Sequence, residues 1–152
     1  MYKPSDDNLA NNEIIEILTT QLKYHQELLR HTCKIKKTLT GACNTELLDR
    51  TMNERGLVID QLLSSKKYYD SIKESGRFAD NSTGKASVDV LTHQIQELLN
   101  STIIHDAENR CLMKEHIRNI TDNLEKIQEG KHLIDNERKC VEILPSLVDI
   151  CG

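Results

Sequence analysis

The chain has 152 residues, about the length of one domain, and carries a net charge of −4 at pH 7, without the basic stripe of a general nucleic-acid-binding protein. It contains one Phe, four Tyr, no Trp, two prolines and six glycines, and 29% of its residues are charged. This composition predicts an all-α protein, because sandwiches and doubly wound sheets need more β-branched and aromatic runs.

The first predicted element is a helix over about residues 9–40, after a polar start that contains Pro4. Apolar residues recur there at spacings of three and four, which is typical of one helical face. Three polar residues, His25, Thr32 and Lys36, interrupt this stripe, and Gly41 is expected to end the helix. The stripe consists of Ile14, Ile15, Leu18, Leu22, Leu28, Leu29, Ile35 and Leu39.

A second helix is predicted over about residues 45–75, with Asn44 or Thr45 as its N-terminal cap and Gly76 as its end. Its stripe includes Arg55 among apolar residues. The connection to the first helix is so short that the two helices should be antiparallel neighbours. Residues 76–86 are rich in Gly, Ser, Asn and Asp and are therefore predicted to form a loop.

A third helix is predicted over about residues 87–139, capped by Ser87, and followed by a short, flexible apolar tail at 140–152. These helices predict an antiparallel three-helix bundle or coiled coil in which the third helix is the longest. If the helices turn back on one another, residues 119–139 extend past the overlap, about 30 Å at 1.5 Å per residue. Their stripe would then have no partner within the chain.

Three explanations of this uncovered stripe remain open: a binding site for another protein, a homodimer interface, or a break at Gly130 that folds residues 131–150 back over the bundle. On the first explanation, the candidate partner-binding residues are the apolar ones of the stripe and of the tail. They are Ile120, Leu124, Ile127, Ile134, Leu144, Leu147 and Val148.

The cellular location is predicted from absences and from the cysteines. No apolar run approaches 18 residues, and residues 1–15 lack the pattern of a signal peptide. The five cysteines are odd in number and form no CxxC pair, which favours free thiols in a reducing cytosol. We therefore expect a cytoplasmic protein that does not insert into a membrane.

No enzymatic activity, metal or other cofactor is predicted. Glu129 and His132 have the spacing of a di-iron motif, but such a site needs two of these motifs and further inward glutamates. His105, Asp106 and Asn109 interrupt the third stripe, and we interpret them as a polar layer that fixes helix register. The alternative, a proton-transfer site, lacks a second convergent group and a nucleophile.

The sequence resembles the flagellar export chaperones of the FlgN family, with FliT-like chaperones as close kin. The resemblance rests on residues 103–110 (IIHDAENR) and 127–131 (IQEGK) of the long helix, and on residues 47–55 (LLDRTMNER), which precede the paired leucines Leu62 and Leu63. Length, number of helices and a variable tail also agree.

This resemblance implies a cytosolic chaperone that binds amphipathic terminal helices of flagellar hook–filament junction proteins. Such a chaperone keeps these hook-associated clients soluble and delivers them to the flagellar type III secretion apparatus. The alternative function is a structural or regulatory coiled-coil homodimer without a client.

Overall fold

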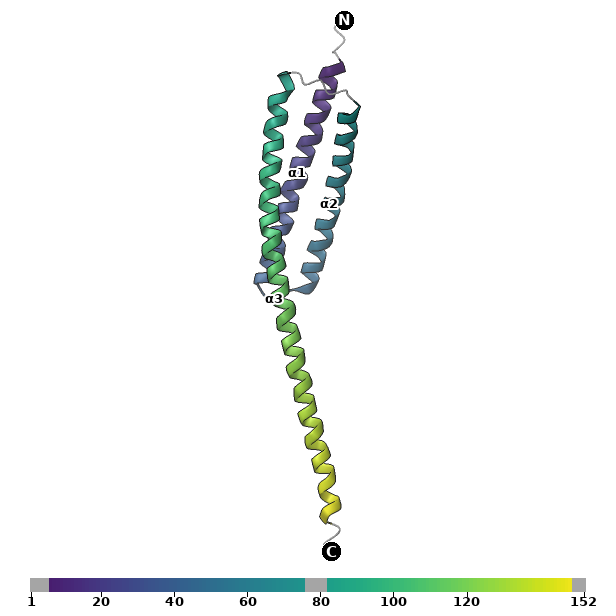
Figure 1. The fold of residues 1–152 in the computed structure, drawn as a ribbon, viewed down its shortest axis with the longest axis vertical. Coiled ribbons are helices and arrows are strands. Elements are labelled where there is room, and N and C mark those ends of the chain that lie inside the picture. Colours follow the sequence, from purple (N-terminus) through teal and green to yellow (C-terminus); the bar gives the residue numbers. More distant parts are fainter. Residues whose placement is uncertain (1–5, 76–81, 149–152) are drawn as a thin grey trace. The chain divides into compact units, whose positions relative to one another are not determined.

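The computed structural model describes the backbone of residues 6–75 and 82–148, and the side chains of residues 11–75 and 84–139. It consists of three helices, α1 (Asp6–Thr40), α2 (Thr45–Glu74) and α3 (Ser82–Val148), with no β-strand among the described residues (Figure 1). The predicted all-α helical bundle is therefore confirmed. The chain divides into two units, residues 1–112 and residues 113–152.

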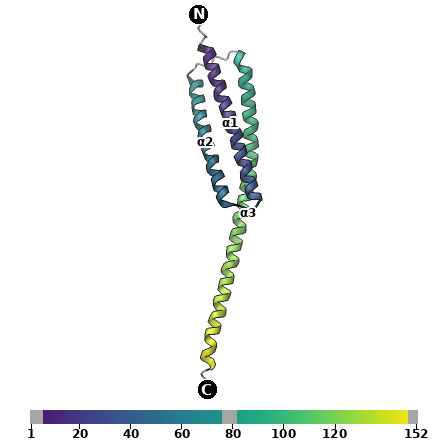
Figure 2. The same cartoon turned by 180° about the vertical axis from the view of Figure 1, so that it is seen from behind.

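The first unit is a bundle in which α1, α2 and the first part of α3 run side by side, as the views from both sides show (Figures 1 and 2). Its core begins with Ile14, Ile17 and Leu18 of α1 and Ile72 of α2. Tyr69 and three residues of α3, namely Val88, Leu91 and Ile95, pack against this cluster. The three-and-four spacing of the apolar residues thus brings one stripe from each helix to a common axis.

The α1–α2 connection follows the predicted signals closely. The Gly41 backbone N–H donates to the Lys37 carbonyl at 3.2 Å, which closes the last turn of α1. The Asn44 side chain then accepts a hydrogen bond from the Leu47 N–H at 3.0 Å and caps the N-terminus of α2. Only residues 41–44 separate the two helices, so they pack as an antiparallel pair.

The helix α3 begins earlier than predicted, at Ser82, so residues 82–86 are helical and not part of a loop. The composition of residues 76–86, rich in Gly, Ser, Asn and Asp, favours a loop here. In the structure Gly84 is buried against Asn11 of α1, and a Cβ atom at this position would meet the Asn11 side chain at 3.3 Å. Packing of α3 against α1 at this point offsets the poor helix propensity of glycine.

At its other end, α3 passes through Gly130 without a break and continues to Val148. The structure therefore does not show a fold-back at Gly130. The segment predicted as a flexible tail is helical as far as Val148. Residues 141–144 contain no helix breaker, and Pro145 removes one backbone hydrogen bond near the end of the helix without ending it. The rest of the tail, residues 149–152, lies outside the described residues.

Gly56, in the interior of α2, offers a simple test of the bundle. A Cβ atom at this position would meet nothing within 4 Å. Gly56→Ala is expected to raise the free energy of unfolding by about 0.8 kcal/mol, because alanine loses less backbone entropy in a helix. Urea denaturation followed by circular dichroism measures the change relative to the wild-type chain. A loss of stability in Gly56→Ala would contradict the described packing of α2.

Candidate protein-binding site

Four of the polar residues that interrupt the three stripes, Thr32, Arg55, Asp106 and Asn109, meet in one layer of the bundle. Arg55 of α2 forms an ion pair with Asp106 of α3, and its Nε donates to the Thr32 hydroxyl of α1 at 3.2 Å. Asn109 of α3 donates through Nδ2 to the Thr32 carbonyl at 2.9 Å. Thr32 and Asn109 are both buried. The layer joins all three helices. It favours the alignment of the helices along the bundle axis in which these groups pair, in agreement with the interpretation from the sequence.

A second polar group lies on the surface next to this layer. The Lys36 ammonium of α1 pairs with the Glu108 carboxylate of α3 at 2.7 Å, and His105 lies 3.0 Å from the same carboxylate. The hydrogen bond from Lys36, followed by that from His105, lowers the pKa of the Glu108 carboxyl. Among the described residues, Asp106 and Asn109 thus make contacts that join α3 to α2 and α1, whereas His105 contacts Glu108 within α3. These contacts favour the structural interpretation of the three residues.

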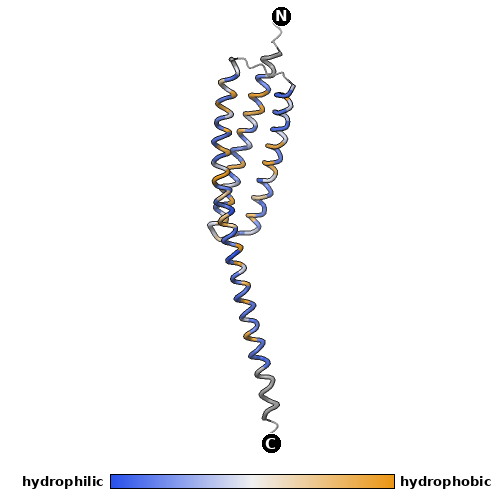
Figure 3. The backbone as a smooth tube through the Cα atoms, in the orientation of Figure 1, coloured by the Kyte–Doolittle hydropathy of each residue, from blue (hydrophilic) through white to orange (hydrophobic). Residues whose placement is uncertain are grey.

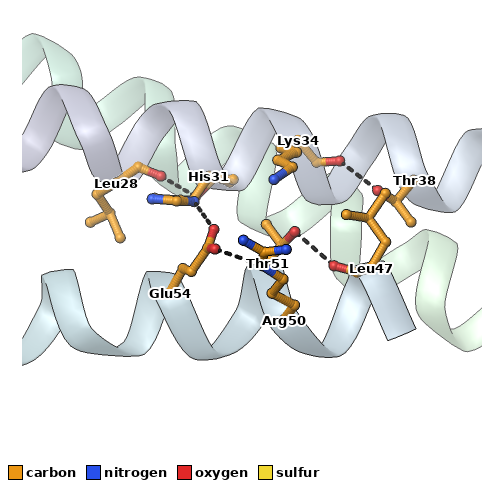
Figure 4. Close-up of polar contacts among 9 residues, drawn as sticks. Leu28, His31, Lys34, Thr38, Leu47, Arg50, Thr51 and Glu54 are labelled. Atoms are coloured by element: carbon orange, nitrogen blue, oxygen red, sulfur yellow. Dashed lines mark hydrogen bonds and ion pairs between the residues drawn. The ribbon is translucent and has the colours of Figure 1, made fainter. Parts of the chain in front are cut away.

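Between α1 and α2, a further set of contacts orders the charged side chains (Figure 4). His31 of α1 points toward Glu54 of α2, at 3.6 Å, and Arg50 donates to the same carboxylate at 3.1 Å. The Arg50 hydrogen bond is the main reason why the pKa of the Glu54 carboxyl is lowered. Thr51 donates back to the Leu47 carbonyl at 2.8 Å, so its hydroxyl is satisfied within α2 although it is fully buried.

The bundle contains a cavity of about 470 Å³ with largely apolar walls from α1, α2 and α3. Two polar atoms of α1, the Gln21 Nε2 and the His25 Nδ1, are buried there without a hydrogen-bond partner among the described residues. Burial lowers the pKa of the His25 imidazole, because the charged form would lose its hydration. At pH 7 the His25 imidazole is therefore mostly neutral, and it lies partly buried at the wall of this cavity.

His25 predicts how stability depends on pH. Its pKa in the folded chain lies below the ordinary value of 6.5, so the unfolded chain binds more protons as the pH falls below 6.5. Stability should therefore decrease with falling pH in that range. In His25→Leu, part of this decrease should vanish. Urea midpoints of both proteins, measured from pH 7.5 to 5, would reveal the difference. Parallel pH profiles would contradict the assignment.

In the second unit, α3 carries a row of exposed apolar side chains. Figure 3 shows how apolar residues recur along the backbone of this part of the helix. We call this row the α3 face and define it as Ile117, Ile120, Leu124, Ile127 and Ile134. Each of these side chains is more than half exposed, from 52% at Ile134 to 64% at Ile117. A row of this size on one side of a helix is unusual for a surface without a partner.

Spacing shows how the α3 face is organised. Its members follow each other at alternating steps of three and four, and Lys131 occupies the one polar position of the series. Apolar residues that repeat every 3.5 residues form the contact stripe of a left-handed coiled coil. On a straight helix this stripe shifts around the helix axis by only about 20° per heptad. Ile117 is not among the partner-binding residues predicted from the sequence. The heptad spacing from Ile134 back to Ile120 could have identified it.

The structure thus exposes four of the seven predicted partner-binding residues, Ile120, Leu124, Ile127 and Ile134, and places them together on one side of α3. The other three, Leu144, Leu147 and Val148, lie on the helical backbone of α3, but their side chains are outside the described ones. Leu133 is 66% exposed but lies off the heptad series.

Three further features of the described residues bear on other kinds of site. No group of three His, Cys, Asp or Glu side chains lies together as a metal site requires. In the same part of the chain, Cys33, Cys43 and Cys111 are free thiols. No helix there combines the length and the apolar character that crossing a bilayer demands. Comparison of the chain with protein-family models, with curated proteins and with solved structures gave no match.

Proposed function

We propose that this protein is a cytosolic export chaperone that binds amphipathic terminal helices of flagellar hook–filament junction proteins and delivers them to the flagellar secretion apparatus. The observation that carries the proposal is the α3 face, a row of five exposed apolar residues on a helix. The resemblance of residues 103–110 and 127–131 to the FlgN family supplies the class of client.

The physical mechanism is coverage of one apolar stripe by another. An amphipathic helix exposes apolar residues that self-associate in water, because burying them releases about 25 cal/mol per Å². When such a helix lies along the α3 face, both stripes are buried, and polar residues of each helix stay in water. Binding needs no chemical step, so release requires only that another interaction of the client replaces this one.

A direct binding measurement tests the proposal. A fluorescent peptide carrying the C-terminal amphipathic helix of a hook–filament junction protein is titrated with the full chain, and anisotropy is recorded. We expect saturable binding with a Kd of about 1 µM, which corresponds to about 8 kcal/mol. The control peptide has serine at its apolar positions and should not bind. If neither peptide binds at protein concentrations up to about 100-fold above the expected Kd, the proposed client class is wrong.

A further inference from the structure

The residues that flank the α3 face change in charge from one end to the other. Lys114 lies at the start of one flank and Asp135 at its end, while Thr121 and Gln128 occupy the equivalent positions between them. Lys114 and Asp135 are both exposed. Among the described side chains, neither takes part in an ion pair within the chain. One flank therefore has a positive and a negative end with a neutral middle.

We propose that the α3 face pairs with the α3 face of a second copy of the chain, in antiparallel orientation. One register brings every apolar member of the face into a layer with a residue of the partner copy. In that register Ile117 lies opposite Ile134, and Leu124 lies opposite Ile127. Residues on the same flank face each other when two helices run in opposite directions. The same register therefore places Lys114 of each copy opposite Asp135 of the other.

Lys131, the polar member of the series, gives a separate argument for this orientation. In a parallel pair in register, the two Lys131 ammonium groups would share one layer and repel each other. In the antiparallel pair each Lys131 lies opposite Ile120, and the two lysines are about 16 Å apart along the axis. Its long alkyl stem can cover the isoleucine while the ammonium group reaches water.

The inference does not rest on the proposed function, since it requires no client. It does give the α3 face an occupant when clients are absent. In the dimer, the partner copy covers the five exposed apolar side chains of each chain and removes them from water. Where the proposed client helix binds the same face, it must displace the second copy, so the client lowers the proportion of dimer.

Charge reversal on the full chain tests the proposal, with oligomeric state measured by sedimentation equilibrium under reducing conditions. Lys114→Glu places two glutamates opposite two aspartates in the antiparallel dimer and should raise the dimer Kd about tenfold. Asp135→Lys should do the same. The double variant Lys114→Glu/Asp135→Lys restores both attractions and should return the Kd to within about threefold of the wild type. Lys126→Glu, on the opposite side of α3, is the control with the same change of net charge as Lys114→Glu.

Each possible result decides the matter. Weakening by both single reversals and recovery in the double variant support the antiparallel pair. In a parallel pair Lys114 and Asp135 lie about 30 Å apart, so neither reversal would have an effect beyond that of Lys126→Glu. That result would overturn the inference. A chain that stays monomeric at about 100 µM would overturn it as well. Circular dichroism of each variant confirms that the helices remain formed, because all three positions are exposed.

Discussion

Leu124→Asp/Ile127→Asp is expected to weaken binding of the client peptide about 100-fold or more, without loss of helical structure. Both side chains are more than half exposed, so aspartate at these positions remains hydrated in the free chain. In the complex the two carboxylates would be buried against apolar residues, and their desolvation has no compensating partner. Truncation of a central apolar anchor alone weakens an interface by about 2 kcal/mol or more.

The measurement is the same anisotropy titration, accompanied by circular dichroism and a thermal melt. Val90→Asp/Leu133→Asp is the matched control, because it introduces the same charges at two exposed apolar positions outside the α3 face. We expect the control to bind as the wild type does. Normal binding by Leu124→Asp/Ile127→Asp would show that the client docks elsewhere. Equal losses in both variants would point to a general effect of charge.

A second large effect is expected in the polar layer. Asp106→Leu should lower the free energy of unfolding by about 2 kcal/mol, because it leaves the Arg55 guanidinium partly buried without its carboxylate. The Arg55 and Asp106 side chains are only 23% and 26% exposed, so water compensates the loss incompletely. Arg55→Met/Asp106→Leu removes both charges and should recover most of this stability.

Urea denaturation followed at 222 nm compares the two variants with the wild type. The comparison of single with double substitution separates the cost of an unpaired charge from the contribution of the pair itself. If the double variant is as unstable as Asp106→Leu, the attraction between Arg55 and Asp106 itself stabilises the fold. The cost of an unpaired Arg55 would then be the smaller contribution. If Asp106→Leu is fully stable, the ion pair with Arg55 does not form in solution.

Much of the bundle could be predicted from the spacing of apolar residues and from the residues that end or cap helices. The apolar stripes gave three helices, and Gly41 and Asn44 fixed the α1–α2 connection to within a residue. The ends of α3 could not be predicted in this way. At its start, the contact of Gly84 with Asn11 is tertiary and leaves no local signal. At its end, the change in composition at residue 140 suggested a boundary that the backbone does not have.

The candidate site was partly predictable for a similar reason. Exposure of Ile120, Leu124, Ile127 and Ile134 follows from a stripe that continues beyond the expected reach of the other helices. Ile117 is not among the predicted residues, because helical and coiled-coil repeats differ by only about 20° per heptad and only the longer series of apolar residues separates them. The partners of Arg55 could not be predicted, since they depend on how three helices are aligned along the axis.

The connection of only four residues between α1 and α2 has a consequence for the order of folding. Closing so short a loop costs little chain entropy, and contacts between residues near in sequence form faster than distant ones. We therefore expect the α1–α2 hairpin to assemble first during synthesis and to present its apolar groove. The first part of α3 then docks onto a template that is already formed.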